Sequence, residues 1–338
     1  MFDNAPSGST RVEWHVDLPI EARPWHVGLI VGPSGSGKSS IARELWPRNI
    51  VSGFDWPADR SVLDAFPPGM SVKEIVALIG ALGFNSPPAW QRPFQVLSNG
   101  EQFRVTIARA LAETDALVVA DEFTSVVDRQ VAKIASHCVA KVIRKRARQF
   151  IAVSCHADII EWLQPDWIFE PATGDFNWRE LRRRPPLELD VHAIDRASWR
   201  AFKAHHYLSP TLHTAAKCWG AWIGEELVGF TSCIRFPHAI VKNMYHAHRL
   251  VVLPDYQGVG IAQALADWMG QHMWEQGERC VFVVAHPAMM SFLRRSTRWT
   301  EKRSKGTQPA GGLRSEMKKR HANSQWRQTA SFEYQPPK

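Results

Sequence analysis

A glycine-rich segment near the start of this sequence has the residue types that hold nucleotide phosphates. Residues 32–39 read G-P-S-G-S-G-K-S and follow an apolar run from Val27 to Val31. Glycines in such a turn let backbone N–H groups converge on phosphate oxygens at the positive end of a helix. The lysine then reaches the terminal phosphates, and the next serine hydroxyl binds Mg²⁺. The predicted phosphate-binding residues are Gly32, Ser34, Gly35, Gly37, Lys38, Ser39 and Ser40.

Two apolar runs further along the chain end in side chains that suit nucleotide hydrolysis. The run at residues 116–120 is followed directly by Asp121 and Glu122. The run at residues 151–153 is followed, three residues on, by His156. Short apolar runs of this kind predict buried strands. Between them and the glycine-rich segment lies L-S-N-G-E-Q at residues 97–102, which precedes a run with helical character.

Together these segments resemble the ATPase domain of the ABC superfamily, in which an L-S-G-G-Q signature opens a helix. The resemblance implies ATP and Mg²⁺ as cofactors and an ATP-dependent homodimer, in which each nucleotide lies between the phosphate loop of one subunit and Ser98 and Gly100 of the other. It also implies that Asp121 and Ser39 hold Mg²⁺, that Glu122 polarises the attacking water and that His156 contacts the γ-phosphate. The signature departs from the family at Asn99, a residue that tolerates a left-handed backbone.

Part of the ABC pattern is missing from this chain. The segment between the phosphate loop and the signature is short, and no glutamine follows the strand predicted near residues 50–54, although Gln91 and Gln95 are possible substitutes. No apolar run approaches the roughly 20 residues that span a bilayer. We therefore favour a cytoplasmic ATPase over the ATPase subunit of a transporter.

A second glycine-containing turn lies in the other half of the chain. The predicted strand 246–253 leads into Q-G-V-G-I-A at residues 257–262, which opens a predicted helix to Trp274, and a further strand follows at 280–285. We also predict a final edge strand at 327–334. A glycine turn between a strand and a helix again places backbone N–H groups where phosphates bind.

This second arrangement resembles the GNAT acyltransferases, over roughly residues 187–334. The resemblance implies that acetyl-CoA, or another acyl-CoA, binds with its pyrophosphate on the turn and its pantetheine arm along the strand before it. The implied cofactor-binding residues are Val251, Val252, Gln257, Gly258, Val259, Gly260, Ile261 and Ala262.

The acyl-transfer chemistry of this half is less defined by its residues. Many GNAT enzymes protonate the leaving thiolate with a tyrosine on the helix after the fifth strand, and residues 286–294 contain none. The candidate catalytic residues are His206 and Tyr207, with His248 and Ser291 as further titratable or hydroxyl groups. The histidine–tyrosine segment also resembles phage Mom-type proteins, which modify adenine in DNA, so the acceptor is an amine or a nucleobase.

Composition agrees with a two-domain globular protein. The chain has 338 residues, 45% of them hydrophobic, and a net charge of +8, which permits DNA as a partner. Its five cysteines form no C-x-x-C pair and fit a reducing cytoplasm. We predict an α/β fold: an ABC-type ATPase domain over residues 1–181, a linker over 182–190, and a GNAT-like domain over 191–338 with a mixed, mostly antiparallel sheet. The alternative is an ATP-gated protein that binds or modifies DNA.

Overall fold

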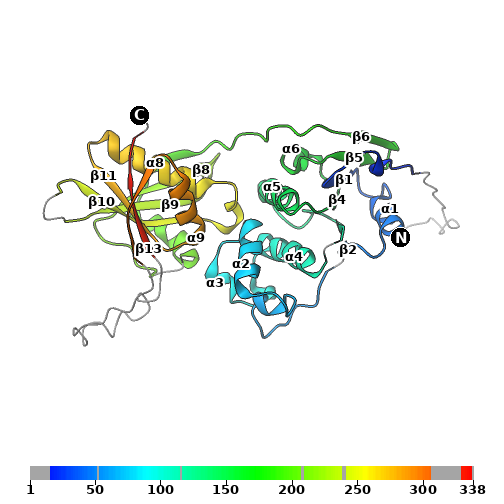
Figure 1. The fold of residues 1–338 in the computed structure, drawn as a ribbon, viewed down its shortest axis with the longest axis horizontal. Helices are drawn as coiled ribbons and strands as arrows, with labels where there is room; N and C mark the ends of the chain where they lie inside the picture. The colour runs from blue at the N-terminus through cyan, green and yellow to red at the C-terminus, as the bar shows by residue number, and fades with distance from the viewer. Residues whose placement is uncertain are drawn as a thin grey trace, which may run out of the picture. The chain divides into compact units, whose positions relative to one another are not determined.

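The computed structural model of the chain describes residues 16–51, 53–114, 116–206, 209–237, 241–305 and 329–336. It divides into two compact units (Figure 1). The first comprises Met1–Phe84 and Trp90–Pro186, and the second comprises Asn85–Ala89 and Leu187–Lys338. The division between Pro186 and Leu187 falls within the segment 182–190 that we predict to be a linker.

The first unit is built on a six-stranded sheet of order β2-β3-β4-β1-β5-β6. Every pair is parallel except β5 with β6, which is antiparallel. The strands are β1 (Val27–Val31), β2 (Ile50–Val51), β3 (Val118–Ala120), β4 (Phe150–Ser154), β5 (Trp167–Glu170) and β6 (Asp175–Trp178). All residues of β1, β3 and β4 are buried, as expected of parallel strands covered on both faces.

The helices of the first unit follow the strands in an α/β order. They are α1 (Lys38–Leu45), α2 (Val72–Ala81), α4 (Asn99–Glu113), α5 (Arg129–Lys145) and α6 (Ile160–Leu163), with short 3₁₀ turns at Ile20–Ala22, Val62–Ala65, Phe94–Val96 and Ala157–Ile159. The short helix α3 (Pro87–Trp90) spans a point of division between the units.

The second unit is built on a seven-stranded sheet of order β12-β13-β11-β10-β9-β8-β7. Only β10 and β11 pair in parallel, so the predicted mixed and mostly antiparallel sheet is confirmed. The strands are β7 (Asp190–Ala193), β8 (Lys217–Ile223), β9 (Glu226–Arg235), β10 (Met244–Val252), β11 (Arg279–Val284), β12 (Trp299–Lys305) and β13 (Thr329–Tyr334). The helices are α7 (Trp199–Phe202), α8 (Ile261–Glu275) and α9 (Pro287–Arg295), with 3₁₀ turns at Arg196–Ser198, Lys203–His205 and Pro254–Tyr256.

The last strand is not at the edge of this sheet, so our prediction of an edge strand over 327–334 is wrong. β13 lies between β11 and β12 and pairs antiparallel with both. β12, which the sequence analysis did not identify, takes the edge. Ala330, Phe332 and Tyr334 are buried on one face of β13, but alternation of this kind does not distinguish an interior strand from an edge strand.

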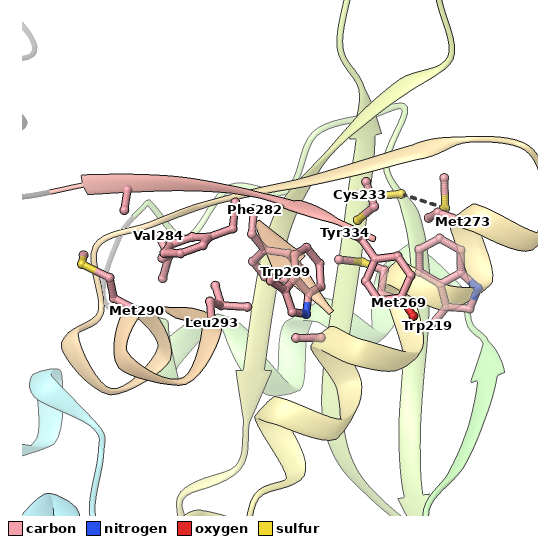
Figure 2. Packing of buried hydrophobic residues seen from close by; sticks show 14 residues of the cluster. Trp219, Cys233, Met269, Met273, Phe282, Val284, Met290, Leu293, Trp299 and Tyr334 are labelled. Carbon is pink, nitrogen blue, oxygen red and sulfur yellow. Dashed lines mark hydrogen bonds between the residues drawn. The ribbon is translucent and has the colours of Figure 1, made fainter. Parts of the chain in front are cut away.

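A cluster of aromatic and sulfur-containing side chains joins α8, α9 and this sheet (Figure 2). Trp299 packs edge to face against both Phe282 and Tyr334, at centroid distances of 5.2 Å. Its indole N–H donates to Asp267 Oδ1 on α8 at 2.7 Å, which gives the polar end of a buried ring a partner. The cluster fixes α8 against the strands and therefore fixes the loop from which α8 begins.

Candidate functional sites

The phosphate loop of the first unit runs from the end of β1 to the first turn of α1. Gly35 and Gly37 have φ values of +81° and +87°, a conformation that favours glycine. Gly37 is the N-cap of α1 and no side chain caps this helix, so its first N–H groups are available to an anion. A Cβ on Gly32 would lie 3.0 Å from Ser36 Oγ, so the loop is tightly wound. These features fit phosphate binding.

Lys38 lies along its own loop. Its Nζ donates to the carbonyl oxygen of Pro33 at 2.6 Å, and only 9% of the residue is exposed. The ammonium group is therefore held beside the backbone N–H groups rather than extended into solvent. This is the position from which a lysine meets the phosphates that the loop cradles.

Ser39 and Asp121 meet at the carboxyl end of the sheet. Ser39 Oγ donates to Asp121 Oδ1 at 2.7 Å, and Arg43 approaches the other carboxylate oxygen at 3.2 Å. A hydroxyl and a carboxylate are the hard oxygen ligands that Mg²⁺ prefers. Within the described residues no group of three or more His, Cys, Asp or Glu side chains could hold a metal ion. A site with one hydroxyl and one carboxylate fits an ion that takes its remaining ligands from nucleotide phosphates and water, as Mg²⁺ does.

Glu122 lies in a sharp turn directly after β3. It is exposed and has φ +51°, its N–H donates to Asp121 Oδ1 at 3.0 Å, and Thr124, two residues on, has φ +66°. Left-handed backbone at two residues that are not glycine stores strain, and such strain is concentrated at functional sites. The turn directs the carboxylate of Glu122 away from the core.

His156 follows β4, the strand beside β3. Its N–H donates to Ser154 Oγ at 3.1 Å, and its ring Nδ1 lies 3.2 Å from the Sγ of Cys155. Since β1, β3 and β4 are parallel neighbours, the segments that carry Lys38, Asp121, Glu122 and His156 all leave the same edge of the sheet. The roles assigned to these residues stay predictions.

The signature segment begins α4. Ser98 is its N-cap and forms a capping box: Ser98 Oγ accepts from the N–H of Glu101 at 3.3 Å, and Glu101 Oε2 accepts from the N–H of Ser98 at 3.0 Å. Asn99 is the first helical residue and is not left-handed, so its tolerance for that backbone is not what allows it here. Gly100 is buried in the first turn.

The two glutamines named as substitutes differ in the structure. Both are exposed, but Gln95 Nε2 donates to the carbonyl oxygen of Trp56 at 3.0 Å. The ring of Trp56 stacks on Phe94 at 4.5 Å and lies under the guanidinium of Arg109 at 4.8 Å. Gln95 is therefore the one that links the segment after β2 to the residues before α4.

In the second unit, β10 and β11 begin together and then separate. Their register runs only from Met244 opposite Arg279 to His246 opposite Val281, whereas β10 remains paired with β9 up to Val252. From Ala247 onward β10 therefore has no β11 partner in this register. Val251 and Val252 lie on this stretch with buried side chains. An extended ligand arm could pair with the backbone of β10 along this open edge.

The loop after β10 forms an anion-binding turn at the start of α8. Gly258 and Gly260 have φ values of +92° and +98°, and Gly260 is the N-cap of α8 without a side-chain cap. Gln257 ties the loop to the strand, since its Nε2 donates to Val252 O at 2.8 Å. Val259 lies between the glycines, and Ile261 and Ala262 begin the helix. The turn fits a pyrophosphate for the same reasons as the phosphate loop.

Histidines gather where β10 leaves β11. A register shift between Ala247 and Arg249 marks a bulge at His248. Burial, with Arg249, His213 and His206, lowers the pKa of His248 to about 4. The His206 ring lies edge to face on Trp199 at 5.7 Å. Tyr207 lies outside the described residues, and Ser291 is exposed on α9.

Some polar residues of the second unit, among them two at the bulge of β10, were not identified as candidates from the sequence. Arg249 Nη2 donates to Thr211 O at 2.7 Å, and the N–H of His213 donates to His248 Nε2 at 3.1 Å. His286, the N-cap of α9, is a further histidine whose pKa burial lowers. A β-bulge has no clear sequence signal, so the involvement of Arg249 and His213 could not be predicted.

Basic residues gather at 141–146, 179–184 and 294–320 of the sequence, and one arginine of each of these runs forms an ion pair in the structure. Arg144 pairs with Asp166 at 3.0 Å, Arg179 with Glu161 at 3.1 Å, and Arg294 with Glu301 at 3.0 Å. Residues 306–320 lie outside the described residues. Among the described helices none has the length and apolar character needed to cross a membrane.

The fold and loops define two classes of domain: a P-loop nucleotide-binding domain of α/β type, and an α/β domain whose mixed sheet opens beside a glycine turn. Comparison with known proteins shows what these domains are similar to. The family model described as the acetyltransferase (GNAT) family matches residues 158–296, a range that begins inside the first unit. Residues 158–296 are thus similar to GNAT acetyltransferases.

The chain is also similar to curated ATP-binding proteins of transporters. The zinc import ATP-binding protein ZnuC of Pseudomonas aeruginosa is 30% identical over 134 residues, which are 33% of this chain and 48% of that protein. The hemin import ATP-binding protein HmuV of Rhodococcus jostii is 26% identical over 174 residues, 40% of this chain and 58% of that protein. The chain thus spans about half the length of the curated relatives it matches.

Solved structures resemble each half of the chain. The ATP-binding cassette MJ0796, in a dimeric post-hydrolysis state with ADP and Pi, covers 46% of this chain and 86% of its own length at 17% identity and a TM-score of 0.38. A Bacillus subtilis acetyltransferase in complex with CoA covers 44% of this chain and 100% of its own length at 10% identity and a TM-score of 0.34.

Proposed function

We propose that this protein binds and hydrolyses ATP with Mg²⁺ in its first unit and transfers an acyl group from an acyl-CoA in its second. The observation that carries this proposal is the pair of glycine turns. Each lies between a strand and a helix, and each leaves the N-terminus of its helix without a side-chain cap. Such turns bind phosphates, and ATP and CoA are both polyphosphates.

In the first unit the expected contributions of the residues follow from their chemistry. Lys38 and the loop N–H groups bind and orient the phosphates, and Ser39 and Asp121 hold Mg²⁺, which neutralises phosphate charge when bound. Glu122 positions a water in line with the γ-phosphate, and His156 donates to a γ-phosphate oxygen. The protein would thus act by positioning and by electrostatics.

In the second unit, acyl transfer needs a neutral amine, a polarised thioester carbonyl and a proton for the leaving sulfur. The amine nitrogen forms a bond to the thioester carbon, the C–S bond breaks, and the proton lost by nitrogen ends on the sulfur of CoA. His206 and Tyr207 are the proposed groups for these proton transfers. The bulge at His248 frees backbone N–H groups from the ladder, one of which could polarise the carbonyl.

We further propose that ATP brings two copies together, since the signature residues Ser98 and Gly100 start a helix whose N-terminus suits a γ-phosphate. If this assembly drives acyl transfer, ATP should change both the oligomeric state and the transfer rate. Light scattering and CoA release, measured with and without ATP, test the coupling. An unchanged rate on ATP-dependent dimerisation would remove the coupling but leave each separate activity.

The acceptor is an amine or a nucleobase. Mass spectrometry of nucleosides from the DNA of cells that express the protein tests the nucleobase directly, with Gly260→Glu as the control. A new base that is absent in the control would support a DNA-modifying enzyme. Unmodified DNA would leave small-molecule and protein amines, to be tested as a panel with acetyl-CoA. None of the five cysteines, all of which lie within the described residues, forms a disulfide, which supports a reducing compartment.

A further inference from the structure

A loop between the 3₁₀ turn at Lys203–His205 and β8 is attached to the bulge of β10 by two consecutive side chains. His248 Nε2 accepts from the N–H of His213 at 3.1 Å, and Arg249 Nη2 donates to Thr211 O at 2.7 Å. Arg249 Nη1 also donates to the carbonyl oxygen of His248 at 2.7 Å, which fixes the guanidinium. Residues 209–215 are here called the acceptor loop.

The bulge explains why both side chains reach one loop. In a regular strand, consecutive side chains point to opposite faces of the sheet. Here Ala247 is opposite Cys233 and Arg249 is opposite Ser232, so His248 is an extra residue on β10. An extra residue interrupts the alternation and lets two neighbours lie on the same side. Without the bulge, His248 and Arg249 could not both contact the loop.

The hydrogen bond to His213 defines the state of the His248 ring. A ring nitrogen that accepts an N–H carries no proton, so His248 Nε2 is unprotonated when it holds His213. Its Nδ1 lies 3.4 Å from Arg249 Nη1. The charged and titratable groups around it are Arg249 on its own strand, His213 on the acceptor loop and His206 before that loop. Burial and these groups keep the pKa of His248 low, at about 4. Nε2 is therefore engaged in holding the loop and is not free to take a proton from a substrate.

The attachment lies where the proposed reaction takes place. If the pyrophosphate of an acyl-CoA lies on residues 257–261, its arm must run back along the open edge of β10. From Val252 back to His248 is four residues, or about 13 Å of extended strand. The thioester then lies beside the bulge, to whose side chains the acceptor loop is hydrogen-bonded.

We propose that His248 and Arg249 are positioning residues that hold the acceptor loop as one wall of the acceptor site. This inference rests on the proposed acyl transfer for its purpose, but the attachment itself is a property of the free protein. The hydrogen bonds of the two side chains determine the position of the loop, and the loop in turn determines how an acceptor amine approaches the thioester.

Hydrogen exchange of the acceptor loop in the full chain tests the proposal. His248→Ala should speed exchange of the His213 amide by roughly 2- to 10-fold, as expected for the loss of one hydrogen bond. His248→Gln should restore protection, because its amide oxygen can accept at a similar distance. Arg249→Met and Arg249→Lys form a second pair, in which the lysine keeps a donor for Thr211 O. His192→Ala, on β7, is the control and should change nothing.

The pH profile separates positioning from a purely structural role. In the wild type, protection of the loop, corrected for intrinsic exchange, should fall as the pH drops from about 6 toward 4, because protonated Nε2 cannot accept. In His248→Gln it should not fall over this range. Equal loss of protection in His248→Ala and His248→Gln, or a pH profile that His248→Gln leaves unchanged, would overturn the proposal.

Titration with acetyl-CoA separates this inference from the proposed function. The His248 and Arg249 variants should still bind acetyl-CoA, because they keep the 257–261 turn and the backbone of β10 along which its arm is proposed to run. If the wild type bound no acetyl-CoA while the exchange results were as expected, the acyl-transfer proposal would fail and the attachment would stand. If the wild type bound acetyl-CoA but the variants left loop exchange unaltered, the positioning proposal would fail alone.

Discussion

Ser39 Oγ donates a 2.7 Å hydrogen bond to Asp121 Oδ1 across 82 positions of the sequence. The bond joins the first turn of α1, the helix after β1, to the residue that follows β3, and β4 lies between β1 and β3 in the sheet. It brings together the hydroxyl and the carboxylate that the sequence analysis assigned to Mg²⁺. Glu122 is the next residue along the chain, so the candidate metal site and the candidate water-positioning carboxylate belong to one turn.

Glu122→Gln is predicted to reduce ATP hydrolysis while ATP binding remains. Loss of a group that orients or deprotonates a nucleophile costs about 10²- to 10⁴-fold in rate. The variant should also accumulate as an ATP-bound dimer, detectable by gel filtration with ATP and Mg²⁺. Glu44→Gln, at an exposed position on α1, is the matched control and should hydrolyse ATP normally. A Glu122→Gln protein that stayed monomeric with ATP would contradict the dimer proposal.

Gly28→Ala is predicted to destabilise the first unit. A Cβ at Gly28 would lie 2.1 Å from the fully buried ring of Trp167 on β5. The ring also packs against Trp25 and Phe176 and has little room to move. Overpacking of this kind costs about 1–3 kcal/mol of unfolding free energy. Chemical denaturation measures the loss, and Gly69→Ala, where nothing lies within 4 Å of the added Cβ, should be near neutral.

The unfolding free energy of the first unit is predicted to fall as the solution is acidified from about pH 6.5 to about pH 4. Burial, followed by the charges of Arg184 and Lys141, lowers the pKa of His137 on α5 to about 4. An unfolded histidine titrates near 6.5, so in this interval the unfolded chain binds a proton that the folded chain does not. Stability contributed by neutral His137 is thus present above pH 6.5 and lost as the pH falls through the interval.

Denaturation of His137→Gln over the same pH range measures this contribution. The variant should show a flatter stability profile than the wild type between pH 4 and 6.5. His192→Gln, at an exposed position on β7, is the control. A wild-type profile that the His137 replacement does not flatten would show that this histidine is not the cause.

The features that depend on short sequence motifs were predicted better than those that depend on pairing between segments far apart in the sequence. Short segments were enough to predict β1, the glycines of both turns and α8. An apolar run, a glycine turn and a helix start together form a phosphate-binding motif that can be recognised locally. The capping box of Ser98 and Glu101 is also a local S-x-x-E signal, which the signature motif led us to overlook. The interior position of β13 depends on β12, and the partners of His248 depend on a bulge. Neither pairing leaves a periodic pattern in the sequence.

Two binding equilibria test the central claim most directly. Isothermal titration compares the two turns. The wild type, Lys38→Ala and Gly260→Glu are each titrated with ATP and Mg²⁺ and, in a separate experiment, with acetyl-CoA. Gly260 has φ +98°, so a glutamate there strains the turn and places a negative charge where phosphates bind. Gly277→Glu is the control, because Gly277 also has a positive φ and open space but lies after the far end of α8.

The account predicts that the wild type binds both ligands. Lys38→Ala should weaken ATP binding by roughly 10- to 100-fold, the loss expected for a hydrogen bond to a charged group, and leave acetyl-CoA binding unchanged. Gly260→Glu should do the reverse. A wild type that bound no acetyl-CoA, or a Gly260→Glu variant that bound it as well as Gly277→Glu, would contradict the claim that the second turn is an acyl-CoA site.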